Sequence, residues 1–324
     1  MVKLISEKNY QQMMLTVVEP GLAAMREEME IQVSGGSLHA EIYNRYDAKR
    51  AIVIVHGYTE CAEKYRELCW YFVSAGYSVF VYDQRGHGRS VREVEDLSVT
   101  HVDRFDRYIE DLTAVMEQAV RPRMGGAPVY LFGHSMGGAV AARMLMEHPD
   151  WFCRAVLNAP MIKCVTGGVP FRVTEAIMKL ECLLGKGNCR AAVGKPFDPE
   201  RETFERSHST SRARFDYFQQ KRISTPEYQN CSPTNAWLRE ATGVTHVLLN
   251  PANAAKIKTP LMLIQAGLDS IVRLPEQQQF VGLVEGAKLV CLDDAKHEIY
   301  CGHDEVITRY LDTVLTFFAE GCAV

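Results

Sequence analysis

A serine flanked by glycines, in Gly133-His134-Ser135-Met136-Gly137-Gly138, stands between an apolar run and a segment of helical composition. A G-x-S-x-G sequence in this context is typical of a sharp turn that joins a strand to a helix. Small residues are needed two positions either side of the serine, because a Cβ there would collide with the neighbouring backbone. We therefore expect Ser135 to adopt a strained conformation, with its hydroxyl above the edge of a sheet and close to a helix N-terminus.

Strand-like and helical segments alternate over most of the chain. Short runs rich in Val, Ile and Leu predict buried strands, and the longer segments between them predict helices. The expected strands are 51–55, 78–82, 128–132, 155–158, 261–265 and 288–292, and the expected helices are 63–74, 102–119, 136–148, 275–285 and 305–318. Residues 29–43 predict a hairpin that turns at Gly35-Gly36. The pattern predicts an α/β fold with a mostly parallel central sheet flanked by helices, and the hairpin adds antiparallel strands at one edge.

Residues 162–255 interrupt this alternation with a helical, polar stretch. Because a bare loop of this length is uncommon between two strands, we expect a helical cap inserted over the carboxyl edge of the sheet. The predicted division is a first core part at 1–161, the cap at 162–255, and a second core part at 256–324. Residues 162–240 carry 13 Lys/Arg and 9 Asp/Glu. Two explanations of this positive charge balance remain open. Either the cap simply has a solvated helical surface, or it is attracted to anionic lipid or to a phosphate headgroup.

Composition excludes several classes of protein. The formal net charge is −4 and no arginine-rich helix stands out, so we expect no nucleic-acid partner. No apolar run approaches the roughly 20 residues of a membrane span, and the first residues lack the apolar core of a secretory signal. None of the 10 cysteines forms C-x-x-C, so no zinc site is expected. We expect reduced cysteines in a cytoplasmic protein, with a disulfide between Cys182 and Cys189 or between Cys291 and Cys301 left open.

A serine hydroxyl is a weak nucleophile near neutral pH, so Ser135 requires a histidine base and an acid that orients it. His297 follows the last expected strand by a short loop, and Asp269 follows the strand at 261–265. Open parallel sheets build their sites at such strand ends. We therefore predict Ser135, Asp269 and His297 as the catalytic residues, in the chain order nucleophile, acid, base. No cofactor and no metal is expected.

A tetrahedral intermediate also needs two backbone donors aimed at its oxyanion. Met136 follows the nucleophile, so its amide should supply one of them. The other should come from the amide of Tyr58, in the loop after the strand at 51–55, where Gly57 lets the chain approach the substrate. At the end of the next strand, Asp83 is better explained as a structural acid.

Taken together, these motifs resemble the α/β-hydrolase family, and within it the group of monoacylglycerol lipase and lysophospholipase L2. The residues that carry the resemblance are His56-Gly57-Tyr58, 83–90, 133–138 and Ala159-Pro160-Met161-Ile162, with weaker similarity to lysophospholipase L2 in 211–215 and 233–239. The resemblance covers the chain from about residue 30 to the end. It implies a serine hydrolase that cleaves a carboxylic ester of lipid type, a monoacylglycerol or a lysophospholipid, through an acyl-enzyme.

Other activities on the same fold remain open. An aminopeptidase of the proline-iminopeptidase type uses the same three residues but needs acidic cap residues that bind a free amine, and the cap's positive balance counts against it. In an acyltransferase, an alcohol or amine would replace water. A protein that only binds ligands would be expected to have lost one of the three positions.

The expected partner is a small-molecule ester or a lipid, with transient contact between the cap and a membrane surface. Five apolar cap residues either line a channel for an acyl chain or pack the cap on the core: Phe171, Ile177, Met178, Leu180 and Leu183. The sequence does not predict an oligomeric state.

Overall fold

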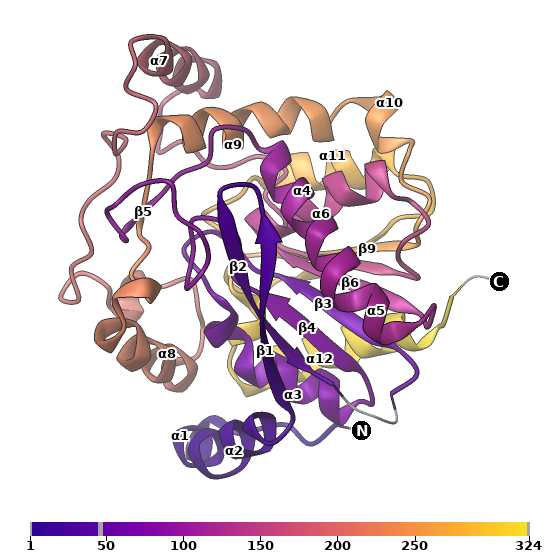
Figure 1. Cartoon of the computed structure of the whole chain (residues 1–324). Helices are drawn as coiled ribbons and strands as arrows, with labels where there is room; N and C mark the ends of the chain where they lie inside the picture. The colour runs from indigo at the N-terminus through magenta and orange to yellow at the C-terminus, as the bar shows by residue number, and fades with distance from the viewer. Residues whose placement is uncertain (1, 45–47, 323–324) are drawn as a thin grey trace.

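The computed structural model describes residues 2–44 and 48–322, and within them it forms one eight-stranded sheet and one two-stranded sheet (Figure 1). The order in the large sheet is β1 (Arg26–Val33), β2 (Gly36–Tyr43), β4 (Ser78–Tyr82), β3 (Ala51–Val55), β6 (Val129–His134), β7 (Ala155–Asn158), β9 (Leu261–Ala266) and β10 (Lys288–Leu292). Strand β2 is antiparallel to β1 and β4, and every other pair in this sheet is parallel. The predicted α/β fold, with an antiparallel hairpin at one edge, is confirmed.

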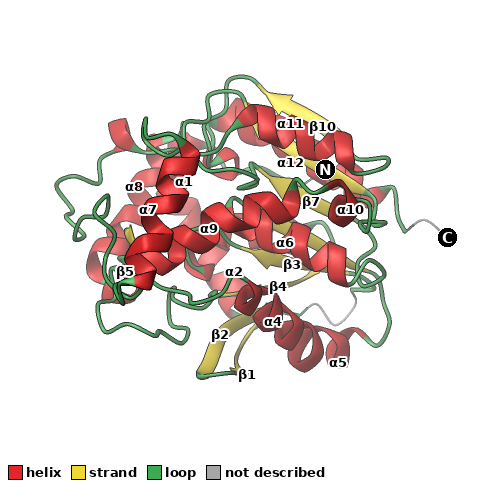
Figure 2. Ribbon diagram, turned by 90° about the horizontal axis from the view of Figure 1, so that it is seen from above, coloured by secondary structure: helices red, strands yellow, loops and turns green. Residues whose placement is uncertain are grey.

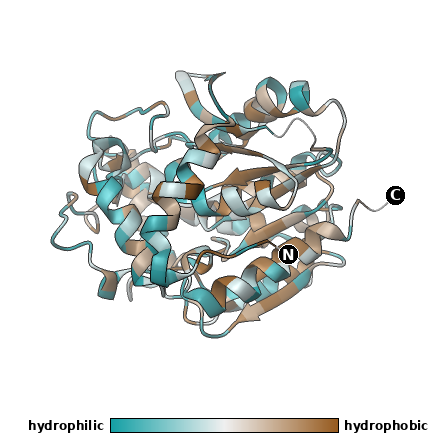
Figure 3. Ribbon diagram, turned by 90° about the horizontal axis from the view of Figure 1, so that it is seen from below, coloured by the Kyte–Doolittle hydropathy of each residue, from teal (hydrophilic) through white to brown (hydrophobic). Residues whose placement is uncertain are grey.

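Each central strand divides its side chains between two hydrophobic cores. In β3, Val53 and Val55 belong to one core, and Ile52 and Ile54 belong to the other. This follows from the period of two along a strand. Because both faces are buried, the strands are continuous apolar runs, and Figure 3 shows them as brown ribbons between helices with teal outer faces.

Helices cover both faces of the sheet (Figure 2). The first core is covered by α4 (Asp106–Val115), α6 (Met136–Glu147) and α11 (Leu274–Leu283). The second is covered by α3 (Arg66–Ser74), which follows a 3-10 turn at Ala62–Tyr65, and by α12 (Asp304–Ala319). These helices lie close to the predicted segments.

One predicted helix differs from its expected range of 102–119. It begins at Asp106, passes through a π-helical turn at Met116–Val120 and continues as α5 (Arg121–Met124). Pro122 explains the wider turn, because a proline cannot donate the usual backbone hydrogen bond and its ring collides with the carbonyl four residues earlier.

The N-terminal helices were not predicted. They are α1 (Tyr10–Met13) and α2 (Glu19–Ala23), joined by a second π-helical turn at Met14–Val18. Here Pro20 follows the wide turn, as Pro122 does in the other helix. These helices lie beside α3 and α8 at the bottom of Figure 1.

Between β7 and β9 the chain is mostly helical. Its elements are α7 (Phe171–Leu183), a 3-10 turn at Phe204–Arg206, α8 (Arg212–Ser224), a 3-10 turn at Pro226–Tyr228, β8 (Ser232–Pro233), α9 (Asn235–Leu248) and α10 (Pro251–Ala254). Strand β8 pairs with β5 (Val99–Thr100) in the small sheet. The division of the chain at residues 161 and 255 stays a prediction. In the part of the chain that the structure describes, no helix has both the length and the apolar character to cross a bilayer.

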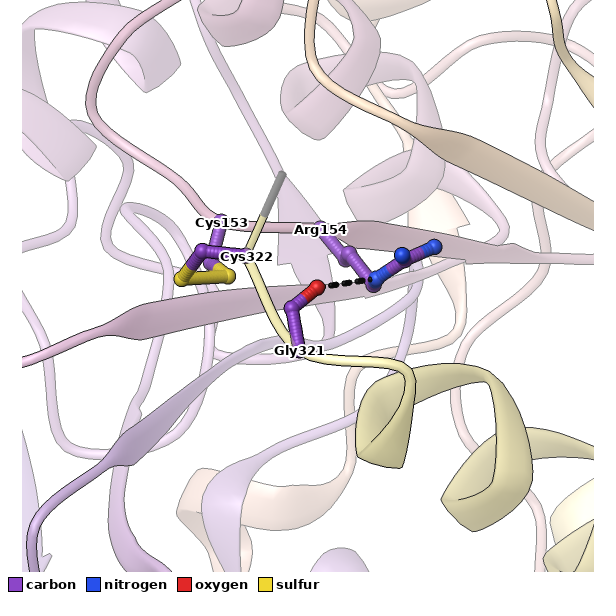
Figure 4. The surroundings of a disulfide bond; sticks show 4 residues. All are labelled: Cys153, Arg154, Gly321 and Cys322. Carbon is purple, nitrogen blue, oxygen red and sulfur yellow. Dashed lines mark hydrogen bonds between the residues drawn. A yellow bond between two sulfur atoms is a disulfide. The ribbon is translucent and has the colours of Figure 1, made fainter. Parts of the chain in front are cut away.

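A disulfide joins Cys153, just before β7, to Cys322 near the C-terminus (Figure 4). Beside it, Nε of Arg154 donates a hydrogen bond of 2.6 Å to the carbonyl of Gly321. The expectation of reduced cysteines is therefore wrong for this pair, whose members lie 169 residues apart and meet only because α12 returns the chain to the sheet. Disulfides persist in oxidising compartments, so this bond counts against the cytoplasmic location, which stays a prediction.

The two cysteine pairs that the sequence left open are not bonded. Cys182, Cys189, Cys291 and Cys301 are all free thiols. Short spacing in the sequence was therefore a poor guide to which cysteines meet.

Candidate active site

Ser135 occupies the strained turn that its flanking glycines predict. It lies between β6 and α6 with φ 52° and ψ −117°, a left-handed φ that is rare for residues other than glycine. A Cβ on Gly133 would lie 2.6 Å from the carbonyl oxygen of Gly137, and a Cβ on Gly137 would collide with the carbonyl oxygen of Val55. The close approach of these backbones explains why both flanking positions are glycine.

The structure brings Ser135, His297 and Asp269 together. The hydroxyl of Ser135 lies 2.8 Å from Nε2 of His297, and Nδ1 of His297 lies 2.6 Å from Oδ2 of Asp269. An ionised carboxylate only accepts hydrogen bonds, so Nδ1–H donates to Asp269. Nε2 is then free to accept the hydroxyl proton, as a general base must.

Backbone amides orient Asp269. Its Oδ1 accepts hydrogen bonds from the amides of Ile271 at 2.8 Å and Val272 at 3.1 Å, which leaves Oδ2 for His297. Burial acts to raise the pKa of Asp269, but the hydrogen bond from His297 and these two amides outweigh it and lower the pKa below its usual value. Asp269 is therefore held in the charged form that fixes the tautomer of His297.

The backbone amides of Tyr58 and Met136 are both available to donate a hydrogen bond to an oxyanion. Met136 is the first residue of α6, where an amide has no acceptor within the helix. Tyr58 follows Gly57, where a Cβ would lie 2.7 Å from Oε2 of Glu60, and precedes Thr59, which has a left-handed φ of 61°. Within residues 2–44 and 48–322 neither amide donates to a protein acceptor. Their role as oxyanion donors stays a prediction.

Glu60 is a residue that the sequence analysis missed. Its buried carboxylate accepts hydrogen bonds from the amide of Gly57 at 2.6 Å, the hydroxyl of Tyr65 at 2.6 Å and the hydroxyl of Tyr300 at 2.5 Å. These contacts join the loop that carries Tyr58 to the loop that carries His297. A glutamate three residues after the glycine was the only sequence signal.

The partly buried Lys64 extends this network. Nζ of Lys64 lies 3.0 Å from Glu60 and 2.7 Å from Glu298, the residue after His297. Burial acts to raise the pKa of Glu60, but the charge of Lys64 and the hydrogen bonds outweigh it and hold the pKa well below the usual range. Glu60 is therefore a fixed negative charge behind the candidate site.

The side chain of His134 is hydrogen-bonded to Asn158 rather than to Ser135. Its Nδ1 lies 2.8 Å from the side-chain amide nitrogen of Asn158, and its ring centroid lies 4.9 Å from that of His297. Burial lowers the pKa of His134 to about 4, against the opposing charge of Glu60, so its ring is neutral at pH 7. Asp83 also has the expected structural role, because it accepts hydrogen bonds from the amides of Ala62 and Arg89.

Aromatic residues join the Tyr58 loop to α9. The ring of Tyr58 lies against that of Trp237, with centroids 4.2 Å apart, and Nε1 of Trp237 donates to the hydroxyl of Tyr108 at 3.2 Å. On the other side of the site, the carbonyl of His208 accepts a hydrogen bond of 2.9 Å from the amide of Glu298. The segment between β7 and β9 therefore lies over the loops that follow β3 and β10.

A cavity of about 210 Å³ lies beside the site, between α3, α8, residues 201–208 and the loop after His297. His208 lines it, and its ring centroid is 6.4 Å from that of His297. A shallower hollow continues from it past Lys195 and shares the walls formed by Arg201, Arg206 and His208.

The carboxylates that line the cavity are all paired with cations. The pairs are Glu63 with Arg66 and Lys221, Glu67 with Arg214, Glu202 with Arg222, and Glu298 with Lys64. In the hollow, Asp198 pairs with Arg201 at 3.0 Å. Lining cations outnumber lining carboxylates, so the wall carries a positive excess.

The apolar residues of α7 do not form an enclosed channel. Ile177, Leu180 and Leu183 are exposed, so for these three residues both expected roles, channel lining and packing on the core, are wrong. Met178 is buried and Phe171 is half-buried, as packing requires. The exposed residues lie on the outer face of the helix instead.

One group of side chains away from the site has metal-ligand character. Glu28, His39 and Glu41 offer ligand atoms within 4.8 Å of one another. Oε2 of Glu41 already lies 2.7 Å from the guanidinium of Arg66, which would compete with a cation for it. The expectation of no metal and no cofactor stays a prediction.

Three comparisons with known proteins agree with the hydrolase-like fold of the chain. The family model described as "Serine aminopeptidase, S33", Hydrolase_4, matches residues 46–304. Lysophospholipase L2 of Escherichia coli (strain K12) is 30% identical over 284 residues, which cover 83% of this chain and 80% of that protein. Monoglyceride lipase of Homo sapiens is 33% identical over 114 residues, which cover 35% of this chain and 36% of that protein.

Among solved structures, a soluble variant of monoglyceride lipase from Saccharomyces cerevisiae in complex with a substrate analog has a TM-score of 0.72. The match covers 91% of this chain and 96% of that chain at 17% identity, so it shows the fold alone. The family match and the lysophospholipase L2 match each extend over most of the chain. The chain therefore belongs to the Hydrolase_4 family of α/β-hydrolases, in the group that contains lysophospholipase L2 and the monoglyceride lipases.

Proposed function

We propose that this enzyme cleaves a carboxylic ester of a monoacyl lipid, a monoacylglycerol or a lysophospholipid, with Ser135 as the nucleophile. The observation that carries the proposal is the hydrogen-bonded series Ser135, His297, Asp269 in a strained strand-to-helix turn. The relatives named lysophospholipase and monoglyceride lipase support carboxylic-ester hydrolysis of a lipid.

In the proposed reaction, Oγ of Ser135 attacks the ester carbonyl carbon while Nε2 of His297 takes the hydroxyl proton. The tetrahedral intermediate then breaks its bond to the glycerol oxygen, which takes that proton from His297 and leaves as an alcohol. A water molecule, deprotonated by His297, attacks the acyl-enzyme. The fatty acid departs and Ser135 recovers its proton.

The amides of Tyr58 and Met136 would donate to the oxyanion in both tetrahedral intermediates. Each such donor stabilises the transition state by about 3–4 kcal/mol. The left-handed backbone at Thr59 and the hydrogen bond from Gly57 to Glu60 support a fixed position for the Tyr58 amide. A preorganised donor needs no reorientation during the reaction, which is why a rigid loop matters here.

An aminopeptidase is the second candidate, because the matching family model carries that description. Such an enzyme needs an unpaired carboxylate that binds the substrate's free amine. The carboxylates that line the cavity beside His297 are already paired with cations. This arrangement favours the ester hydrolase.

A substrate panel tests the proposal. Monoacylglycerols, lysophospholipids, short p-nitrophenyl esters and aminoacyl amides are incubated with the wild type and with Ser135→Ala. We expect ester cleavage by the wild type and its loss in Ser135→Ala. Ester cleavage that survives in Ser135→Ala would contradict the mechanism, and a preference for amides over every ester would favour the aminopeptidase.

The outer face of α7 supports the expected contact with a lipid surface. Val173, Ile177, Leu180 and Leu184 recur every three or four residues and are exposed, with Leu184 at 60%. A stripe of this spacing lies on one face of a helix. A lipid surface is the proposed occupant, because it would hold the proposed substrate and would cover the apolar side chains.

Vesicle binding tests this contact. The wild type should sediment with phosphatidylcholine vesicles that contain phosphatidylglycerol, and the double variant Leu180→Ser, Leu184→Ser should bind several-fold less. Leu289→Ser is the matched control, since Leu289 is an exposed leucine on β10, away from α7. Equal binding by all three proteins would contradict a contact through α7.

A further inference from the structure

We propose that the cavity beside His297 and the hollow continuous with it bind the phosphate of the substrate's headgroup, with Arg206 and Lys195 as the residues that hold it. The substrate is then a lysophospholipid rather than a neutral monoacylglycerol. This inference rests on the proposed ester hydrolysis at Ser135, because the phosphate belongs to the alcohol that leaves from there.

Charge pairing singles out these two residues. The lining carboxylates are each matched by a cation, as in Glu202 with Arg222 at 3.0 Å and Glu67 with Arg214 at 2.9 Å. Within the described ranges 2–44 and 48–322, Arg206 and Lys195 have no carboxylate partner. Their charges are therefore available to an anionic ligand, whereas the paired cations are already neutralised.

The position of the cavity suits the leaving alcohol. Thr59, next to the candidate oxyanion donor, and His208, next to the ring of His297, both line it. In a lysophospholipid the phosphate lies only a few bonds beyond the ester oxygen that His297 would protonate. A phosphate in the cavity would therefore be compatible with an ester carbonyl at Ser135.

The backbone around Arg206 is fixed on both sides. Its amide donates to the carbonyl of Thr203 at 3.1 Å, and the carbonyl of His208 accepts from the amide of Glu298 at 2.9 Å. The 3-10 turn Phe204–Arg206 thus presents the guanidinium from a held segment. A guanidinium group can bind a phosphate through two parallel hydrogen bonds, whereas the ammonium group of a lysine acts as a point charge. Arg206 is therefore expected to contribute more to phosphate binding than Lys195.

The positive charge of the residues that line the cavity and the hollow argues against recognition of a cationic or a neutral headgroup. An ammonium group would meet a positive excess, and a neutral glycerol would leave the charge of Arg206 unused. The excess of 13 Lys/Arg over 9 Asp/Glu in residues 162–240 includes both Arg206 and Lys195. Part of that excess thus lies beside the candidate site and not only on a solvated surface.

Steady-state kinetics on matched substrates test the inference. The substrates are 1-decanoyl-glycero-3-phosphoethanolamine, 1-decanoylglycerol 3-phosphate and 1-decanoylglycerol, each below its micellar concentration so that no lipid surface takes part. The proteins are the wild type, Arg206→Gln, Lys195→Gln and Arg172→Gln. Arg172 is the matched control, an exposed arginine of α7 outside the cavity.

We expect Arg206→Gln to raise KM about tenfold for both phosphate substrates, with kcat changed less than twofold and 1-decanoylglycerol unaffected. Lys195→Gln should act in the same direction with a smaller effect, and Arg172→Gln should match the wild type. An equal change on all three substrates, or no change on any, would overturn the headgroup site while ester hydrolysis stands. Failure of the wild type to cleave any ester would instead contradict the proposed function.

Inhibition separates a lipid headgroup from a free anion. sn-Glycerol 3-phosphate should inhibit competitively, glycerol should not, and the inhibition constant should rise about tenfold in Arg206→Gln. Inorganic phosphate should inhibit more weakly than glycerol 3-phosphate. Equal inhibition by the two anions would assign the cavity to free phosphate and overturn the headgroup assignment.

Discussion

The carboxylate of Glu60 accepts a hydrogen bond of 2.6 Å from the backbone amide of Gly57, the residue before Tyr58. The same carboxylate binds Lys64, which in turn binds Glu298 beside His297. One buried acid therefore connects the candidate oxyanion loop to the loop of the candidate base.

We expect Glu60→Gln to lower kcat about 10- to 100-fold on a p-nitrophenyl ester with little change in KM. The glutamine side chain lacks the negative charge with which Glu60 binds Gly57, Tyr65 and Lys64. The Tyr58 amide, the candidate oxyanion donor, is then less well positioned. Breaking a buried ion pair should also lower the free energy of unfolding by about 3–5 kcal/mol. Kinetics and thermal unfolding measure the two effects separately.

Glu63→Gln is the matched control for this prediction. Glu63 pairs with Arg66 and Lys221 near the same end of α3 but does not contact the Tyr58 loop. It should lower stability without the loss of kcat. If Glu60→Gln and Glu63→Gln have the same kcat, Glu60 has a structural role only.

Asp269→Asn should lower kcat by about 10⁴-fold, because an amide cannot hold His297 in the tautomer that accepts the Ser135 proton. The side chain of Asp269 is fully buried and binds two amides, so the variant's melting temperature must be measured beside its activity. Asp294→Asn is the control, since Asp294 pairs with exposed Arg309 on the surface. A similar kcat in both variants would contradict the assignment of the acid.

The strands and the three residues at the site could be predicted because both leave local patterns. Buried parallel strands are apolar runs, and their carboxyl ends meet at one edge, so Ser135, Asp269 and His297 at strand ends had to lie near one another. The flanking glycines gave a further local signal, since Gly133 and Gly137 are required by close backbone contacts.

The rest depends on contacts between distant residues that no local pattern records. Glu60 meets Tyr300 across 240 positions, and Cys153 meets Cys322 across 169. The exposed stripe on α7 could be identified as apolar, but whether it faces inward depends on how α7 lies against α9. Periodicity predicts that an amphipathic helix has an apolar face, and it does not say what covers that face.

Removal of the disulfide should lower thermal stability without abolishing activity. Cys322→Ser frees the C-terminal residues from the start of β7, and the loss of a native disulfide typically costs about 2–4 kcal/mol. Thermal unfolding should show a melting temperature several degrees lower, while kcat at 25 °C stays within about twofold because the bond lies away from Ser135. Cys291→Ser, which changes a free exposed thiol, should leave the melting temperature unchanged.

Glu41 should make the stability of the fold depend on acid pH. Burial acts to raise its pKa, but the imidazole of His39, 3.7 Å away, and the charge of Arg66 outweigh it and lower the pKa from 4.5 to about 2. The folded state therefore binds this proton less readily than the unfolded state. The stabilisation is present above pH 4.5 and is lost as the pH falls from about 4.5 towards 2.

Chemical unfolding of the wild type and Glu41→Gln between pH 2 and 7 measures this contribution. At pH 7 the ionised Glu41 should contribute up to about 3 kcal/mol through its lowered pKa. The difference in the free energy of unfolding between the two proteins should shrink as the pH falls below about 4.5, because protonated Glu41 resembles glutamine in charge. A difference that stays constant across this range would show that the pKa of Glu41 is the same in the folded and unfolded states, so that its contact with Arg66 does not lower it.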